Sequence, residues 1–176
     1  MALIIEKGYD RITVQDILDR ADVGRSTFYA HYRDKEDLLL SGFEDIRVAL
    51  AAAVETNERG AGGKVELLQP LLAVFEHVAK YRHTWGPLSR KGGADVITRI
   101  LREHVAELVR ANLRSQFHAA GTNQTPLAAA VEHVTGACMG VLTWWLDNDI
   151  AYSAEEIHAI FRRLSAPGLR RFMAAR

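Results

Sequence analysis

The 176-residue sequence contains a single cysteine, Cys138. No intrachain disulfide can form, which is typical of proteins that remain in the reducing cytoplasm, and zinc sites built from several thiolates are excluded. No uninterrupted apolar run approaches the ~20 residues that a transmembrane helix needs. Residues 1–10 also lack the basic region and long apolar run of a signal peptide. We therefore expect a cytoplasmic protein that does not enter a membrane.

The sequence also lacks an excess of charge of either sign. Lysine and arginine together number 22, as do aspartate and glutamate. Evidence for nucleic-acid binding must therefore come from a local group of residues and not from the bulk charge. Proline is rare, and no stretch alternates between apolar and polar residues as a half-buried strand does. Apolar residues recur at helical spacing instead, which predicts an all-α protein.

Glycines, prolines and capping residues set the expected helix boundaries. Gly8 stops a first short helix, and Thr13–Asp16 is a capping box, in which a hydroxyl and a carboxylate each bond a free amide. Thr125 is expected to cap the helix that begins at Pro126, and Pro167 to end or kink the last helix. The expected helices span residues 3–7, 13–21, 25–31, 34–58, 65–81, 94–117, 126–149 and 154–167.

Two domains are predicted. Residues 1–47 form an N-terminal domain of three helices, and the third of these continues as a linking helix to about residue 58. Three glycines within residues 60–63 end that helix and leave the chain slack. Residues 48–176 form a larger helical domain.

The stretch "ADVGRSTFYAHYRDKEDLL" has the pattern of a helix-turn-helix motif. Asp22 stands where the first helix must stop and tolerates a left-handed conformation, and Gly24 is an acceptable N-cap for the second helix. Val23, Phe28 and Tyr32 are expected to anchor the second helix, while its polar side chains point outward. The second helix of such a motif enters the major groove of DNA.

The outward side chains have the chemistry that DNA contacts require. Arg25 can donate to guanine O6 and N7 or to a phosphate. Hydroxyl and imidazole groups suit contacts to phosphate and sugar, and they belong to Ser26, Thr27, Tyr29 and His31. Lys35 lies in the first turn of the next helix, where exposed amides favour an anion. The helix end at Thr13 is expected to hold a second phosphate in the same way.

Short motifs follow one another through this region, namely Gly8-Tyr9, Thr13-Val14, Ala21-Asp22-Val23, Thr27-Phe28-Tyr29-Ala30-His31-Tyr32 and Lys35-Glu36-Asp37-Leu38-Leu39. Together they resemble the DNA-binding domain of the TetR/AcrR family of transcriptional regulators. The resemblance implies DNA contacts from Thr13, Arg25, Thr27, Tyr29, His31 and Lys35. It also implies a homodimer on a palindromic double-stranded operator, and a C-terminal domain that binds a small-molecule effector.

This domain departs from the family pattern at Asp22, Gly24 and Ser26, where the family usually has glycine, serine and glycine. Its first helix is short, and we expect the natural chain to begin further upstream. Residues 1–47 carry seven basic and ten acidic side chains, a net charge of −3. Because protein–DNA affinity depends on how many phosphates are neutralised, we expect weak DNA binding with a shallow dependence on salt.

Small residues recur on one face of the helix over residues 126–149, beside an aromatic residue, which suits a homodimer core. This region resembles one group of the family, in which the last two helices of each subunit pair into a four-helix bundle. Packing within one subunit is the alternative. The predicted dimer interface consists of His133, Gly136, Ala137, Gly140, Trp144, Ile157, Ile160, Phe161 and Leu164.

The neighbouring faces of the C-terminal helices carry apolar side chains and a few polar groups, as small-molecule pockets do. The predicted lining consists of Phe75, Trp85, His104, Phe117, Thr135, Cys138 and Trp145. The same residues also fit a packed core, in which His104 would be a core histidine with its hydrogen bonds satisfied.

An enzyme is the main alternative class of protein. No nucleophile elbow, P-loop or dinucleotide fingerprint occurs. Glu155 and His158 form a single Glu-x-x-His unit, whereas a di-iron site needs two such units and further glutamates. We expect no catalytic residue, metal or cofactor. The sequence predicts a ligand-responsive repressor, and the remaining alternative is a dimeric interaction module of the same fold that has lost DNA binding.

Overall fold

A computed structural model describes residues 2–42, 48, 51–52, 55–56, 66–83, 94–119 and 124–174 of the protein. Every regular element in these ranges is a helix, which confirms the predicted all-α fold. In chain order they are α1 (Ala2–Lys7), the 3-10 turn η1 (Tyr9–Arg11), α2 (Val14–Ala21), α3 (Arg25–His31), α4 (Lys35–Ser41), the 3-10 turn η3 (Gln69–Leu71), α6 (Leu72–Lys80), α8 (Ala94–Ala119), α9 (Gln124–Asp147) and α10 (Ala154–Ala174).

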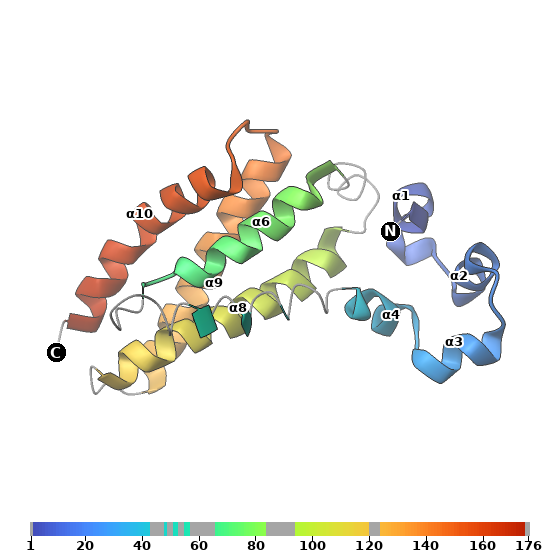
Figure 1. Cartoon of the computed structure of the whole chain (residues 1–176), viewed down its shortest axis with the longest axis horizontal. Coiled ribbons are helices and arrows are strands. Elements are labelled where there is room, and N and C mark those ends of the chain that lie inside the picture. Colours follow the sequence, from blue (N-terminus) through green and yellow to red (C-terminus); the bar gives the residue numbers. More distant parts are fainter. Residues whose placement is uncertain are drawn as a thin grey trace.

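Figure 1 shows α1 to α4 at one end of the molecule and α6, α8, α9 and α10 at the other. Residues 2–42 are called the head and residues 66–174 the body. The predicted domain boundary after residue 47 and the glycines of residues 60–63 lie outside the described residues.

Local sequence signals produce the helices of the head. Gly8 ends α1 with a φ of 79°, a conformation that glycine adopts at little cost. The Thr13 hydroxyl accepts from the Asp16 amide and the Asp16 carboxylate accepts from the Thr13 amide, so the predicted capping box is present. Asp22 is left-handed, with φ 51° and ψ 48°, and ends α2 as predicted. The next helix, α3, spans the predicted residues 25–31.

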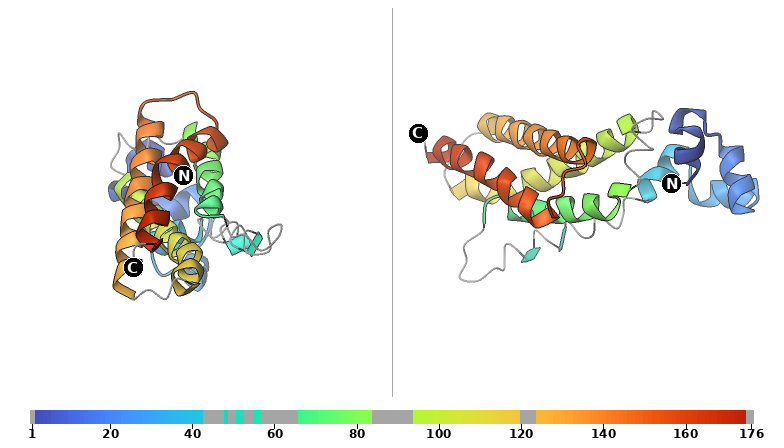
Figure 2. Two further views of the ribbon diagram at one scale, coloured as in Figure 1. Left: turned by 90° about the vertical axis from the view of Figure 1, so that its left-hand side faces the viewer. Right: turned by 90° about the horizontal axis from the view of Figure 1, so that it is seen from above.

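The body is a helical bundle with an aromatic centre. α9 packs along α8, while α10 packs against α6 and α9. Phe75 on α6, Trp145 on α9 and Phe161 on α10 are fully buried, and the Phe75 ring centroid lies 6.4 Å from that of Trp145 and 5.8 Å from that of Phe161. Burying such a side chain contributes roughly 1.5–3 kcal/mol. Seen from above, the bundle carries the head at one end and the C-terminus at the other (Figure 2).

A buried turn precedes α6, where the sequence predicts helix from residue 65. Leu68 adopts a left-handed conformation with a φ of 65°, and η3 and α6 begin after it. Its amide donates to Asn112 Oδ1 at 3.0 Å, and its carbonyl oxygen lies 3.0 Å from Nε2 of His158. Both polar groups of this buried turn are therefore satisfied by side chains from α8 and α10, which offsets the cost of leaving the helix.

The predictions for two prolines were partly wrong. α9 begins at Gln124, so Thr125 lies inside the helix and does not cap it. Pro126 fits there because the first four amides of a helix have no intrahelical acceptor. Pro167 does not end α10, which continues to Ala174. Ala166 and Leu169 are buried on either side of it, so packing holds the helix together across the missing hydrogen bond.

α9 is the most apolar long helix among the described residues. Its segment Pro126–Asp147 is long and apolar enough to cross a membrane by length and composition alone. A core helix passes the same test, so the finding is weak evidence for a membrane span. Only 39% of its most apolar stretch is buried in the protomer, and the face turned away from the core also carries apolar and small residues.

Candidate nucleic-acid interface

α3 divides into a buried side and an exposed polar side. Phe28 is buried beneath the helix, and Tyr29 next to it is 52% exposed. Their rings meet edge to face, with centroids 5.3 Å apart and planes at 87°. The exposed residues of α3 include all five that the sequence predicts to point outward: Arg25, Ser26, Thr27, Tyr29 and His31. The helix therefore presents hydroxyl, imidazole and guanidinium groups to solvent around the buried Phe28.

The anchoring of α3 differs from the prediction at one position. Val23, expected to be an anchor, directly follows the left-handed Asp22 and is 39% exposed. Tyr32 is half-buried, and its ring centroid lies 5.7 Å from that of Phe28. Phe28 and Tyr32 thus anchor α3 without Val23.

The N-terminus of α2 already holds an anionic group. The carboxylate of Asp16 accepts from both the amide and the hydroxyl of Thr13, and Lys7 Nζ lies 2.5 Å from its other oxygen. The hydrogen bonds from Lys7 and Thr13 lower the pKa of Asp16 to about 2. Since the polar groups of Thr13 are engaged by Asp16, a phosphate would meet this carboxylate first. The predicted phosphate contact at this helix end stays a prediction.

Lys35 is likewise engaged within the head. Its Nζ donates to the carbonyl oxygens of Tyr9, Asp10 and Ile12 at 2.9, 3.3 and 3.0 Å. It also lies 4.5 Å from the centroid of the Tyr9 ring. An ammonium group has three N–H donors, so all three have acceptors in this conformation. The predicted DNA contact of Lys35 stays a prediction.

A further cation lies beside α3 that the sequence pattern did not single out. The Arg33 side chain is 85% exposed, directly after the recognition helix, and pairs with Asp37 on α4 at 3.0 Å. Such an exposed pair contributes little to stability, so Arg33 can exchange Asp37 for a phosphate at small cost. Arg25, the predicted base-contacting residue, lies 3.3 Å from Gln15 Oε1 on α2.

Among the described residues, the head meets the body through a small apolar cluster and an ion pair. Ile97 on α8 is buried in a cluster with Ile4, Tyr9 and Ile12 of the head. Beside it, Arg99 on α8 donates to Glu36 on α4. The helix that follows the recognition helix is therefore attached directly to the longest helix of the body.

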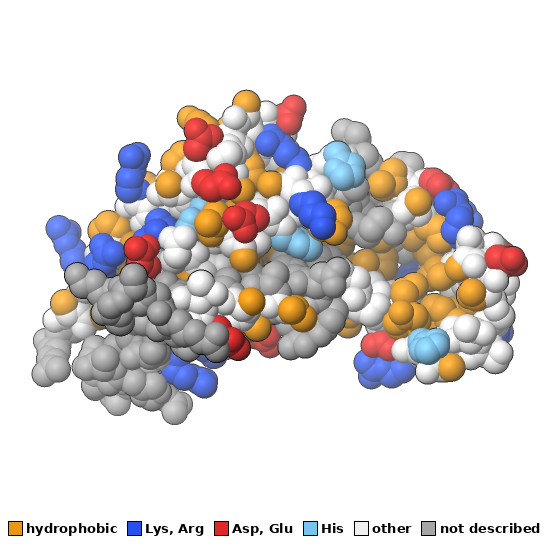
Figure 3. Space-filling view, in the orientation of Figure 1, with side chains coloured by type: hydrophobic (Ala, Val, Ile, Leu, Met, Phe, Trp, Pro, Cys, Tyr) orange, Lys and Arg blue, Asp and Glu red, His pale blue; other side chains and the backbone are white. Residues whose placement is uncertain are grey.

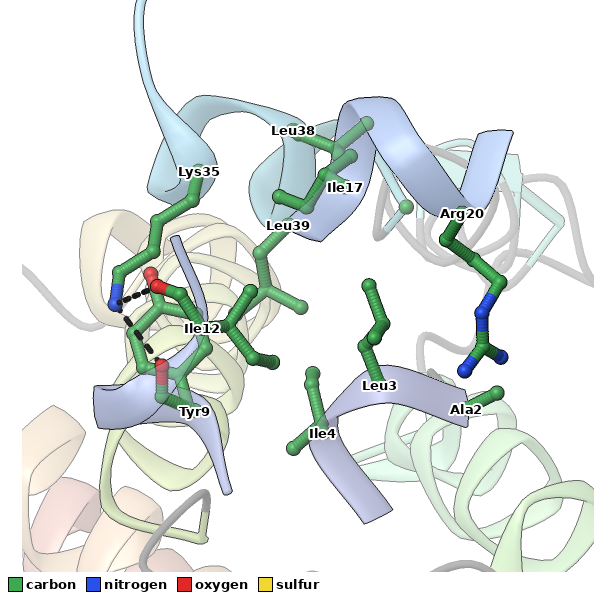
Figure 4. A pocket seen from close by; sticks show the side chains of 11 residues that line it. Ala2, Leu3, Ile4, Tyr9, Ile12, Ile17, Arg20, Lys35, Leu38 and Leu39 are labelled. Atoms are coloured by element: carbon green, nitrogen blue, oxygen red, sulfur yellow. Dashed lines mark hydrogen bonds between the residues drawn. The ribbon is translucent and has the colours of Figure 1, made fainter. Parts of the chain in front are cut away.

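Hydrophobic side chains also line a hollow inside the head, between α1, η1, α2 and α4 (Figures 3 and 4). Its volume is about 360 Å³. The side chains that face it include Leu3, Ile4, Ile17, Leu38 and Leu39, with the stem of Lys35 along one wall. Packing between the first and last helices of the head is therefore incomplete.

The predicted dimer residues fall into two groups. Ile157 and Phe161 lie in the core of the protomer, so they cannot meet a partner, and that part of the prediction was wrong. They face inward because α10 turns this side toward α6. Trp144 is 47% exposed and Leu164 is 73% exposed. His133, Gly136 and Gly140 are exposed as well, and Ala137 and Ile160 are half-buried.

A second hollow of about 360 Å³ lies on this surface. It is lined by Ala129, Ala130 and His133 of α9 and by Gly168, Leu169 and Phe172 of α10. A methyl group added at Gly136 or Gly140 would meet no atom of the protomer within 4 Å. The exposed side of α9 and α10 thus combines small residues, a hollow and large exposed apolar side chains.

Most residues of the predicted ligand pocket are buried in the body. Phe75, Phe117, Thr135, Cys138 and Trp145 are buried, whereas His104 is half-buried. Phe75 and Trp145 lie together, and Trp145 Nε1 donates to the carbonyl of Ile150. His104 Nδ1 lies 2.8 Å from the carbonyl of Ile100. Trp85 is outside the described residues. These contacts place the set in and around the bundle core.

Thr135 differs from its neighbours in the core. Among the buried side-chain atoms of the described residues, its Oγ1 alone has no hydrogen-bond partner. Leaving a hydroxyl unpaired costs roughly 1–3 kcal/mol. Cys138, one helical turn away, has its pKa raised to about 12 by burial, so its thiol remains protonated.

The described residues show no group of three or more histidines, cysteines or acids placed to hold a metal. Within the Glu-x-x-His unit, Glu155 is exposed at the start of α10, and His158 is buried against Leu68. The two side chains thus have separate surroundings and separate partners.

Two family models match the chain. The model described as "Bacterial regulatory proteins, tetR family" matches residues 1–41, and the model "Transcriptional regulator C-terminal region" matches residues 66–166. The second alone covers more than half of the chain. The protein belongs to the TetR family of bacterial transcriptional regulators. The first model covers the helix-turn-helix of the head, and the second covers most of the body.

Solved structures of TetR-family regulators share the fold. A regulator from Syntrophomonas wolfei matches with a TM-score of 0.64 at 19% identity, covering 94% of this chain and 88% of that one. The regulator PfmR from Thermus thermophilus matches with a TM-score of 0.50 at 21% identity, covering 93% and 89%. At these identities the likeness concerns the fold alone.

A curated relative is the transposon Tn10 TetC protein of Escherichia coli, 28% identical over 79 residues. That match covers 45% of this chain and 38% of the relative's length. The relative's own properties therefore do not transfer to the whole of this chain.

Proposed function

We propose that this TetR-family regulator is a cytoplasmic, ligand-responsive repressor that binds a palindromic operator as a homodimer. The observation that carries the proposal is the two-sided α3, in which Phe28 is buried and the polar residues are exposed. Core packing alone does not require so many polar groups on the outer face of a short helix. The proposed DNA contacts are Arg25, Ser26, Thr27, Tyr29 and His31, with Arg33 as an added phosphate contact.

The homodimer would form through the exposed side of α9 and α10. Trp144 and Leu164 are large apolar side chains exposed to solvent in the protomer. Gly136 and Gly140 leave open space on the surface of α9, in which a helix of the second protomer would pack. Aromatic residues beside small ones are typical of homodimer cores. Two protomers joined here by a two-fold axis would present two α3 helices to successive major grooves, which matches a palindromic operator.

The effector would bind in the body, against Thr135. Its unpaired hydroxyl lies among buried apolar side chains, and an effector with one polar group in an apolar frame would satisfy it. By binding one arrangement of the body more tightly than another, such a molecule would shift the population of states. The contacts of Ile97 and Arg99 with the head would transmit that change to α3. The two α3 helices of the dimer would then no longer match the operator spacing.

The test is DNA binding by the whole chain. Footprinting on the DNA that flanks its own gene should locate a palindrome, and Tyr29→Ala with Thr27→Ala should reduce affinity by at least about tenfold, the loss of roughly 1.4 kcal/mol. Glu107→Ala, an exposed change on α8, is the matched control and should bind as the unaltered chain does. Absence of binding to every fragment tested would refute the repressor and favour an interaction module.

A further inference from the structure

The end of the body that lies away from the head carries charge of one sign. Residues 108–131 and 157–176 contain seven arginines and no aspartate, glutamate or lysine. Residues 1–47 have the opposite balance, with seven basic and ten acidic side chains. The neutral net charge of the whole chain therefore conceals a separation of charge along the molecule.

The arginines come from two helices whose C-terminal ends lie together. Phe117 of α8 and Phe172 of α10 are in ring contact, with centroids 6.3 Å apart. Figures 1 and 2 show these two helix ends at the end of the molecule opposite α1 to α4. The packing of the bundle thus brings positive charge from both helices to one end of the body.

Five of the arginines are exposed. Arg110 and Arg114 are four residues apart and share the outer face of α8. Arg163 and Arg170 are seven residues apart and share the outer face of α10, with Arg171 beside them. These five residues are called the basic end, and Figure 3 shows Lys and Arg side chains gathered over this part of α10.

The basic end has no carboxylate partner among the described residues. None of the ion pairs found there involves any of the five. Other arginines of the body are paired, namely Arg82 with Asp149, Arg99 with Glu36, Arg102 with Glu132 and Arg162 with Glu66. The basic end is therefore a place where the described part of the body leaves positive charge uncompensated.

Helix stability does not account for these positions. A cation stabilises the C-terminus of a helix only within about its last turn, and Arg171 does lie in the last turn of α10. Arg110, Arg114 and Arg163 lie more than one turn before the ends of their helices. Their charges are therefore available to an external anion.

Arginine at all five positions indicates phosphate as the anion. The planar guanidinium presents paired N–H donors that match two oxygens of one phosphate. A membrane surface would also need large apolar side chains beside the charges. On α8 the exposed residue between Arg110 and Arg114 is Ala111, and on α10 the exposed Leu164 and Phe172 belong to the side proposed for the dimer.

A duplex suits this surface better than a single strand. Single-stranded nucleic acids stack their bases on exposed aromatic side chains, whereas the ring of Phe172 packs against Phe117. A duplex held by its backbone requires only exposed cations. Because the head belongs to a family of DNA-binding regulators, the duplex within reach of the protein is DNA.

We infer that the basic end binds the phosphate backbone of a second segment of double-stranded DNA, without reading its sequence. α3 and the basic end lie at opposite ends of the molecule (Figure 2), so they are assigned to different segments. The regulator would then join two segments, one held by α3 and one by the arginines. The two surfaces are separate, and either one can fail without the other.

Salt dependence of binding tests the inference on the whole chain, with a DNA duplex of mixed sequence that contains no palindrome. Arg114→Gln with Arg171→Gln removes one charge from each helix. The slope of log K against log salt should decrease in magnitude by about 1.8, because each phosphate no longer neutralised contributes about 0.9. Arg102→Gln is the matched control, since that arginine is paired with Glu132, and its slope should stay unchanged. An unchanged slope in the double variant would overturn the inference.

Arginine labelling of the unaltered chain locates the duplex without any substitution. Phenylglyoxal modification is followed by mass spectrometry, with the duplex at about ten times its Kd. Arg114 and Arg171 should then react about tenfold more slowly, because labelling occurs only in the small unbound fraction. Arg102 should react at the same rate with and without DNA. Protection of Arg25 and Arg33 alone would place the duplex on the head and overturn the inference.

Two further probes distinguish the kinds of partner. Vesicles of phosphatidylcholine and phosphatidylserine should bind the chain more weakly than the duplex does, and so should a single-stranded oligonucleotide of equal length. Tighter binding of either probe, weakened by Arg114→Gln with Arg171→Gln, would overturn the assignment to double-stranded DNA.

The variant Thr27→Ala with Tyr29→Ala separates the basic end from the proposed function. It should lose operator binding and keep the protection of Arg114 and Arg171 by the mixed-sequence duplex. If no operator is found for the unaltered chain, the repressor is refuted, and the labelling rates still decide whether the basic end binds DNA. Loss of protection in the α3 variant would show that the duplex is held by the head, and would overturn the inference.

Discussion

Arg99 on α8 donates a hydrogen bond to Glu36 on α4 across 2.6 Å, and this bond joins the body to the helix that follows the recognition helix. The two side chains are about half exposed. Solvent screens the attraction between such exposed charges. This ion pair therefore affects the relative orientation of the head and the body more than the stability of their contact.

The apolar part of this joint should carry most of its stability. Ile97→Ala is expected to cost about 2–4 kcal/mol, since it opens a cavity among Ile4, Tyr9 and Ile12. Arg99→Gln should cost only a small fraction of that. Urea unfolding of both variants measures the difference, and an equal or larger loss for Arg99→Gln would show that the joint is mainly electrostatic.

His158 should make the body sensitive to mild acid. Burial lowers its pKa, with the nearby charge of Arg162 adding to the shift and the hydrogen bond to the Leu68 carbonyl opposing it. The histidine therefore takes up a proton more readily when the chain is unfolded. Its contribution is complete above a pH of about 6.5 and declines as the pH falls below that value.

His158→Gln keeps an N–H donor for Leu68 and removes the titration. Unfolding free energies measured at pH 7.5 and at pH 5.5 should differ less in this variant than in the unaltered chain. Equal differences in the two proteins would mean that His158 does not contribute to the acid sensitivity.

The exposed side of α9 should tolerate a larger residue in the protomer but not in the dimer. The new Cβ of Gly136→Leu meets no atom within 4 Å beyond the backbone of its own helix and the adjacent residues, and leucine favours a helix over glycine by roughly 1 kcal/mol. We expect unchanged or increased helicity by circular dichroism and a weakened dimer by sedimentation. Glu107→Leu, which adds the same side chain on α8, should leave the dimer intact.

The thiol of Cys138 should be unreactive in the folded protein. Burial raises its pKa to about 12, and only the thiolate is nucleophilic. An aromatic disulfide reagent should therefore react at the rate of unfolding at pH 8, and at full speed in denaturant. Fast reaction in native buffer would show that the core around Thr135 opens readily.

Features set by neighbouring residues could be predicted from the sequence. The bounds of α3, the left-handed Asp22 and the capping box of Thr13 and Asp16 follow from short-range rules of backbone and capping chemistry. The exposure of the polar side chains of α3 also follows, because Phe28 is the apolar side chain that this short helix can bury.

Features that depend on distant partners could not be predicted. Leu68 leaves the helix because Asn112 and His158, 44 and 90 residues away, satisfy its polar groups. Helical periodicity identifies the apolar stripe of α10 but not which neighbour it meets, so Ile157 and Phe161 were assigned to a partner and lie in the protomer core. Lys35 was assigned to a phosphate because the sequence of its own helix does not show that its side chain reaches carbonyl oxygens 23 to 26 residues away.

The acceptors of Lys35 are main-chain oxygens. This determines which substitutions and insertions the head can tolerate. Replacing the exposed Asp10 alters a side chain and leaves its carbonyl in place, so such substitutions should be tolerated. Inserting or deleting one residue between Gly8 and Thr13 would move all three carbonyls away from the ammonium group. The head is therefore constrained in the length of this turn more than in its composition.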